Sequence, residues 1–237
     1  MIVGMTSRRS RLTPQAFFVT GTDTSVGKTV VACALLHAFA SHGKSVAGMK
    51  PVAAGCEESP EGLLNSDVEQ LLAASTVKAP RPMVNPYALK LPIAPHIAAQ
   101  KAGIEIDTAL IKRAFEQLKK MVDVVVLEGV GGFRVPLNSR EDSADLARLL
   151  GVPVILVVGM RLGCLNHALL TWEAIESRGL EMAGWIANCI DPRMAALHEN
   201  VGALEKRIKQ PLLGTLAYHA NARPQQLASV LDIQSLI

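Results

Sequence analysis

The chain has few aromatic residues, few cysteines and no run of like charges, and each shortage excludes a class of protein. Aromatic residues make up 4% of the 237 residues and the formal net charge is only +3, so no surface for nucleic acid is expected. The four cysteines, Cys33, Cys56, Cys164 and Cys189, form no C-x-x-C pair. This spacing argues against a disulfide framework or a zinc site and favours a reducing cytoplasm.

Long hydrophobic runs are also missing. The longest apolar stretch, VPVILVVGM at 152–160, is far shorter than the roughly 20 residues that a membrane helix needs, so we expect a buried strand there and no membrane contact. Residues 1–15 carry arginines with no apolar segment after them, unlike a secretory signal. We interpret residues 1–15 as an irregular leader and residues 16–237 as one domain.

Strand-like and helix-like segments alternate along most of the chain. The apolar run before Gly21 predicts a strand, residues 29–43 a helix that ends near Gly43, and residues 44–50 a second strand. A helix over 107–121, capped by Asp107, leads into a strand over 122–128. At least six strands alternate with helices, which predicts an α/β protein whose parallel sheet, of the phosphate-loop NTPase type, is covered by helices on both faces. The proline-rich segment 56–100 breaks the alternation, so we expect mostly loop there.

Residues 21–29, GTDTSVGKT, follow the first predicted strand and open the next helix, which is the setting of a phosphate-binding loop. In such a loop backbone N–H groups hold a polyphosphate, Lys28 reaches the outer phosphates and Thr29 can bind Mg²⁺. The expected nucleotide contacts are Thr24, Ser25, Val26, Gly27, Lys28 and Thr29. Five residues separate Gly21 from Gly27 instead of four, so the loop is of a modified kind. A strand-to-helix turn with a chance Gly-Lys-Thr is the alternative.

Three further charged residues, Glu128, Asp67 and Lys50, are candidates for the same site. Glu128 ends an apolar strand at the edge where open α/β sheets bind ligands, so it can complete a Mg²⁺ site with Thr29. Asp67 is a second candidate ligand, although Asn-Ser-Asp also suits a helix cap. Lys50 ends the second strand. A surface lysine is the ordinary alternative there, but two lysines could together neutralise charge during phosphoryl transfer to an anionic acceptor.

The segment LGCLNHALLT begins a helix just after a predicted strand. A helix start offers N–H groups and a positive dipole end to an anion, and it can lower the pKa of a thiol such as Cys164. Asn166 could instead merely cap its helix.

The chain contains, in this order, the motifs GTDTSVGKT, KPVAAG, NSD, VNPY, APHIAA, LEGVGG, LGCLNHALLT and GWIAN. Their order and approximate spacing resemble those of dethiobiotin synthetase, and the resemblance runs from Phe17 to Leu216. The resemblance implies an enzyme that uses ATP and Mg²⁺ to convert 7,8-diaminopelargonate and CO₂ (or bicarbonate) into dethiobiotin. One amine forms a carbamate, ATP phosphorylates it, and the second amine displaces phosphate to close the ring.

The same resemblance implies roles for individual residues. The implied catalytic residues are Lys50, Lys28 and Thr24. The implied magnesium ligands are Thr29, Asp67 and Glu128, and the implied adenine contact is Asn188. The implied substrate contacts are Lys50, Gly131, Cys164, Leu165 and Asn166. Of these, the helix start from Cys164 to Asn166 would come from the second subunit of a homodimer with shared active sites.

Two positions depart from the family's pattern. Ala54 stands where relatives often carry a substrate-binding hydroxyl, and Ala217 where a proline is common in the nucleotide-base pocket. Two other classes remain as alternatives. ATPase switches of the partition and division-site kind have a signature lysine where this chain has Asp23. Cobyrinate amidating enzymes add a glutaminase domain for which 237 residues leave no room.

Overall fold

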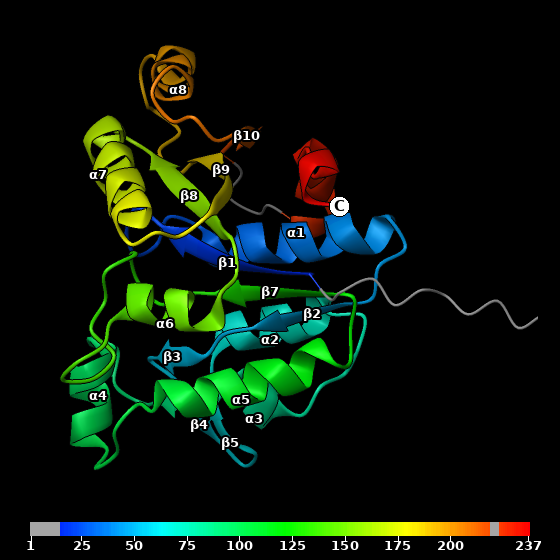
Figure 1. Cartoon of the computed structure of the whole chain (residues 1–237), viewed down its shortest axis with the longest axis vertical. Coiled ribbons are helices and arrows are strands. Elements are labelled where there is room, and N and C mark those ends of the chain that lie inside the picture. Colours follow the sequence, from blue (N-terminus) through cyan, green and yellow to red (C-terminus); the bar gives the residue numbers. More distant parts are fainter. Residues whose placement is uncertain (1–14, 219–222) are drawn as a thin grey trace, which may run out of the picture.

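Six parallel strands form the centre of the molecule (Figure 1). The computed structural model describes residues 15–218 and 223–237. The strands are β1 (Gln15–Gly21), β2 (Val46–Met49), β7 (Val124–Glu128), β8 (Val154–Met160), β9 (Met182–Cys189) and β10 (Leu212–Leu216). They lie in the order β10, β9, β8, β1, β7, β2, with neighbours paired in parallel. The leader expected over 1–15 falls outside the described residues except for Gln15, which opens β1.

The strands are apolar along their length because both faces of the sheet are covered. All seven residues of β8 are buried, as are the five residues of β7. A strand with only one covered face would alternate between apolar and polar residues, whereas a strand covered on both faces does not. The predicted α/β fold with a doubly covered parallel sheet is confirmed.

Helices from different parts of the chain cover the two faces. One face packs against α1 (Lys28–Ser41), α2 (Ser66–Ala74) and a C-terminal segment with α9 (Pro224–Leu227), η1 (Ala228–Val230) and η2 (Gln234–Leu236). The other face packs against α5 (Thr108–Lys119), α6 (Ser143–Leu150), α7 (Cys164–Ser177) and α8 (Leu197–Glu205). Helix α1 is apolar on most of its surface because it lies between the sheet and the C-terminal segment.

The segment that breaks the strand and helix alternation is more ordered than the sequence indicates. Within it, β6 (Tyr87–Leu89) pairs in parallel with β3 (Val52–Ala54), which lies just before the segment, and β4 (Glu57–Ser59) forms a hairpin with β5 (Gly62–Leu64). The segment also contains α2 and two shorter helices, α3 (Arg81–Val84) and α4 (Pro95–Lys101). The expectation of mostly loop over 56–100 is therefore wrong. Three-residue strands are too short to leave a local periodicity to detect.

The arrangement of strands brings several loops to one edge of the sheet. Strand β1 lies between β7 and β8, and β2 lies beyond β7. Because all four strands run in the same direction, the segments that follow them meet at their shared carboxyl edge, where ligands of such sheets bind. None of the described helices is both long and apolar enough to cross a membrane.

Candidate active site

The loop between β1 and α1 has the backbone geometry of a phosphate-binding loop. Gly27 is the N-cap of α1 and has a φ of 87°. A Cβ atom there would lie 2.2 Å from Nδ2 of Asn188, so the position needs glycine for both its backbone angle and its space. The same Nδ2 donates to the carbonyl oxygen of Val26 at 2.8 Å. Asn188, at the end of β9, thus holds the middle of the loop.

Lys28 is buried at the first turn of α1, with 7% of its surface exposed. Its ammonium group donates to the carbonyl oxygen of Asp23 at 2.9 Å. Burial lowers the pKa of Lys28 to about 8, with a smaller contribution from the neighbouring Lys50, although Glu128 works in the opposite direction. The ammonium form is therefore poorly solvated and favours an anionic partner.

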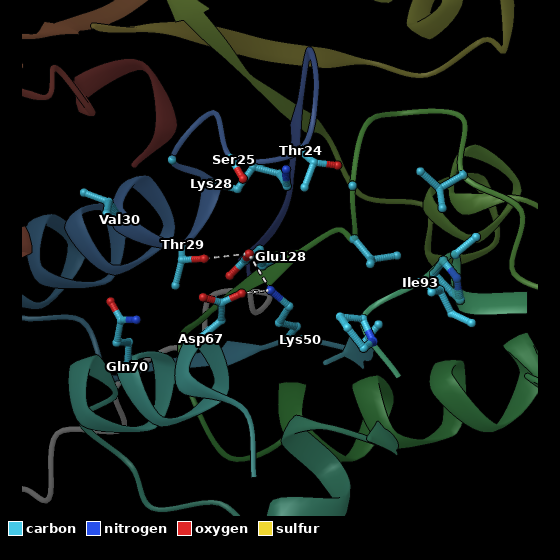
Figure 2. Close-up of a pocket in the computed structure, with 18 residues that line it drawn as sticks. Thr24, Ser25, Lys28, Thr29, Val30, Lys50, Asp67, Gln70, Ile93 and Glu128 are labelled. Atoms are coloured by element: carbon cyan, nitrogen blue, oxygen red, sulfur yellow. Dashed lines mark hydrogen bonds and ion pairs between the residues drawn. The ribbon is translucent and has the colours of Figure 1, made fainter. Parts of the chain in front are cut away.

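Lys50 follows β2 and lies between two carboxylates (Figure 2). Its ammonium group forms an ion pair with Asp67 and a second one, at 2.9 Å, with Oε1 of Glu128. Only 6% of Lys50 is exposed, so the alternative of an ordinary surface lysine is wrong. Burial disfavours the charged form, but the attraction of Glu128 and Asp67 outweighs it and raises the pKa of Lys50.

Glu128 is the last residue of β7 and is almost fully buried. Its Oε1 accepts hydrogen bonds from Lys50 and, at 2.8 Å, from the hydroxyl of Thr29. Its Oε2 is buried and has no hydrogen-bond partner within the described part of the chain. Burial raises the pKa of Glu128, although the neighbouring ammonium group of Lys50 opposes the shift.

Asp67 is the second residue of α2 and does not cap it. The cap is Asn65, whose side-chain oxygen accepts from the backbone N–H groups of Asp67 and Val68 at 3.1 and 3.4 Å. The carboxylate of Asp67 is thereby free to pair with Lys50. The helix-cap alternative for Asp67 is wrong, and the cap that the sequence pattern indicated belongs to its neighbour.

A cavity of about 760 Å³ joins these groups to Gly131 and to an apolar wall. One side carries the phosphate loop together with Lys50, Asp67 and Glu128. The apolar wall comes from the loop before α4, from the segment after β7 and from β3, and consists of Pro92, Ile93, Ala94, Pro95, Val130, Val135 and Ala54. From the sequence we assigned no role to Pro92 and Ile93 and included Ala94 and Pro95 only in the APHIAA motif, because apolar loop residues carry no chemical signature. The site can therefore hold an anion beside an apolar chain.

The helix start at Cys164, Leu165 and Asn166 lies elsewhere, since none of the three lines this cavity in the described structure. The N-cap of α7 is Gly163, with no side-chain cap bond there, so the interpretation of Asn166 as a cap is wrong, and its side chain is exposed. Burial raises the pKa of the Cys164 thiol, against the lowering that a helix start can produce.

The donor set of Thr29, Asp67 and Glu128 fits Mg²⁺. All three side chains offer oxygen, the donor that this ion prefers, and one or two carboxylates with water and phosphate oxygens are its usual ligands. The unpartnered Oε2 of Glu128 is an available donor. No group of three or more His, Cys, Asp or Glu side chains gathers as a metal cluster among the described residues. The candidate site thus depends on two carboxylates and one hydroxyl.

The fold and this site together define a phosphate-loop nucleotide-binding protein. A family model described as an AAA domain matches residues 15–226. The chain is 60% identical over 220 residues to the ATP-dependent dethiobiotin synthetase BioD of Aromatoleum aromaticum, covering 93% of this chain and 98% of the relative. It is 58% identical over 219 residues to the protein of the same name from Nitrosospira multiformis, covering 92% and 95%.

The chain therefore belongs to the family of ATP-dependent dethiobiotin synthetases, and the prediction that it is an enzyme of this family, a ligase, is confirmed. Solved structures share the fold at low identity. The MinD septum site-determining protein of Pyrococcus horikoshii, complexed with Mg-ADP, has a TM-score of 0.54 at 16% identity and covers 94% of this chain and 89% of its own. A MinC:MinD complex of Aquifex aeolicus has a TM-score of 0.54 at 15% identity, covering 87% and 82%. At these identities the likeness concerns the fold alone.

Proposed function

We propose that the chain catalyses ATP-dependent carboxylation and ring closure of 7,8-diaminopelargonate with CO₂, giving dethiobiotin, ADP and phosphate. The observation that carries this proposal is the position of two buried lysines, Lys28 and Lys50, on one cavity beside a phosphate loop. The phosphorylation step brings two anions together, and cations on both sides of them stabilise the approach. The names of the two relatives supply the identity of the product.

The phosphate loop holds ATP. Backbone N–H groups from Thr24 to Thr29 and the start of α1 bind the phosphates, Thr24 contacts the γ-phosphate and Lys28 neutralises the outer two. The Nδ2 of Asn188 is already bonded to Val26, which leaves its Oδ1 to accept from the adenine amino group. Thr29, Asp67 and Glu128 would hold Mg²⁺, which would supply positive charge to the phosphate oxygens.

Lys50 serves the acceptor side. One substrate amine adds to CO₂ and loses a proton, giving a carbamate. A carbamate oxygen then attacks the γ-phosphorus and ADP leaves. Because Asp67 and Glu128 keep Lys50 charged and fix its position, its ammonium group can neutralise the carbamate and then the transferred phosphoryl group.

Ring closure needs the second amine close to the activated carbonyl carbon. That amine attacks the carbon, phosphate leaves with the electrons of the broken C–O bond, and loss of a proton completes the cyclic urea. Gly131 and the apolar wall bind the substrate beside Lys50 and hold its carbon chain against Pro92 and Ile93. Ala54 replaces a hydroxyl contact with apolar surface on the same wall.

The far carboxylate of the substrate binds a second copy of the chain. We infer a homodimer in which the helix start at Cys164, Leu165 and Asn166 of one subunit completes the cavity of its partner, since a helix start suits a carboxylate. Three observations support this arrangement: the start of α7 lies outside the cavity of its own chain, Asn166 is exposed, and the neighbouring Leu162 is 97% exposed. The four buried, free cysteines agree with a cytoplasmic enzyme.

Transfer of label from bicarbonate to dethiobiotin tests the proposed function. Wild-type protein with 7,8-diaminopelargonate, ATP and Mg²⁺ should incorporate the label and release one phosphate for each product formed. Lys28→Ala, matched for folding by circular dichroism, should incorporate none. Hydrolysis of ATP that proceeds equally well without the diamine would overturn the proposal and favour an ATPase switch.

A further inference from the structure

Asp23 contacts three different parts of the phosphate-loop region. Its Oδ1 accepts from the backbone N–H of Thr24 at 2.7 Å, and its Oδ2 accepts from the guanidinium of Arg161 at 2.7 Å. Its carbonyl oxygen accepts from the ammonium group of Lys28 at 2.9 Å. Asp23 therefore contacts the Thr24 amide, the ammonium group of Lys28 and a cation that directly follows another strand.

Arg161 reaches this loop from the next strand of the sheet. It is the first residue after β8, which lies beside β1. Its carbonyl oxygen accepts from the backbone N–H of Cys164 at 3.0 Å, so a closed turn fixes its backbone. The guanidinium is thus presented by two rigid elements, the end of β8 and the start of α7.

The negative charge of the Asp23 carboxylate opposes the binding of polyphosphate to the loop. Asp23 directly precedes the backbone amides from Thr24 onward, so its carboxylate lies close to the phosphates that these amides bind, and the two negative groups repel each other. Arg161 offsets this charge and leaves the carboxylate oriented toward Thr24. Both side chains are about half exposed, at 42% and 48%, and ion pairs of that kind add little to folding stability. We therefore expect the ion pair to affect the loop and its ligand more than the folding stability.

We propose that Arg161 is a positioning residue for nucleotide binding, which acts through Asp23 by neutralising its carboxylate and holding it on the Thr24 amide. The inference relies on the proposed function only in that the loop binds ATP. Without Arg161, the unpaired carboxylate repels the phosphates and the first turn of the loop loses its support.

Binding of ATP to four variants, measured by titration calorimetry at low and at moderate salt, tests this proposal. Arg161→Met should weaken binding about tenfold, the range expected for loss of a charged hydrogen bond. Arg161→Lys should recover part of the affinity because the positive charge remains. In the double variant Asp23→Asn with Arg161→Met, binding should exceed that of Arg161→Met alone, because Asn can still accept from Thr24 and carries no charge. Asp23→Asn alone completes the cycle.

The pair of Arg113 and Asp107 provides a matched control. Asp107 also caps a backbone N–H with one oxygen, at 2.8 Å to Ala109, and accepts from Arg113 with the other, at 3.4 Å. The pair lies at the N-terminus of α5 and does not line the cavity, so Arg113→Met should leave ATP binding unchanged. Wild-type affinity in a folded Arg161→Met protein, or a double variant as weak as that single one, would overturn the proposal. ATP binding is measured without the diamine, so a failure of the synthetase reaction would not by itself produce either of these two binding results.

Discussion

Lys28 and Lys50 are both buried, yet their surroundings shift their pKa values in opposite directions. The nearest partner of Lys28 is a neutral carbonyl oxygen, so burial prevails and its pKa falls to about 8. Lys50 has two carboxylate partners, and its pKa rises. A bound anion is therefore the first counter-ion of Lys28, whereas Lys50 already has two carboxylate counter-ions.

The lowered pKa of Lys28 predicts a pH dependence of ATP binding. Only the ammonium form attracts the phosphates, so the affinity should fall as the pH rises through about 8, and binding above that pH should take up a proton. Calorimetry above that pH in two buffers of different ionisation enthalpy would measure this uptake. In Lys28→Met the proton uptake should vanish and binding should be much weaker. An affinity that stays constant as the pH rises through this value would contradict the assigned environment of Lys28.

Removal of Lys50 should expose the repulsion between its two carboxylate partners. In Lys50→Gln, Asp67 and Glu128 lose their shared cation, and breaking a buried pair of this kind costs about 3 kcal/mol of folding stability. The melting temperature should drop, and added Mg²⁺ should raise it more than in the wild type. Turnover should fall while ATP affinity persists, because the contact strengthens as the phosphorylated carbamate forms. Lost ATP affinity with an unchanged turnover number would reject this role.

At the scale of single elements, short segments place the reactive groups. Asn65 caps α2 and so fixes the start of this helix, from whose first turn Asp67 reaches Lys50. Strand β7 ends at Glu128, and α1 begins at Lys28 with Thr29 facing that carboxylate. Each side chain therefore owes its position to the terminus of a helix or a strand.

Asn65→Ala should affect both stability and the magnesium requirement. Loss of a side-chain cap costs about 1 kcal/mol, which urea denaturation would measure. Because α2 would then begin less sharply, Asp67 should be held less firmly and the Mg²⁺ concentration for half-maximal activity should rise. Asn65→Asp keeps an oxygen acceptor and should retain most of the stability. If the magnesium requirement stays unchanged in Asn65→Ala and also in Asp67→Ala, Asp67 is not a ligand.

At the scale of the whole molecule, the start of α7 does not line the cavity of its own chain. Leu162 is 97% exposed and Leu170, on α7, is 58% exposed. In the homodimer that we propose, a second copy of the chain covers this region and completes the cavity.

Mixing two inactive variants tests this arrangement. Lys28→Ala disables the phosphate loop, and Asn166→Arg blocks the helix start. In a heterodimer one cavity combines an intact loop with an intact helix start, so subunit exchange should restore about a quarter of wild-type activity if the subunits pair at random. Native mass spectrometry, which separates the heterodimer from the two homodimers by mass, would prove the exchange. Absence of recovery despite proven exchange would mean that each chain builds its site alone.

Local sequence determined the pieces that depend on neighbours along the chain. The apolar runs, the Gly-Lys-Thr motif and the Asp107 cap predicted β1, the phosphate loop with α1, and the start of α5. The alternation of strands and helices also predicted the parallel sheet. These features follow from backbone hydrogen bonding and periodicity, which are set by contiguous residues.

Only the tertiary structure decided which residues meet. Lys50 contacts Asp67, 17 residues away, and Glu128, 78 residues away, because β2 lies beside β7 and α2 packs against both α1 and β2. The same packing buries Lys50, which the local sequence does not distinguish from an ordinary surface lysine. Asp23 contacts Arg161 because β1 lies beside β8. Strand order and helix packing arise from burial of apolar surface over the whole chain, and no local pattern encodes them.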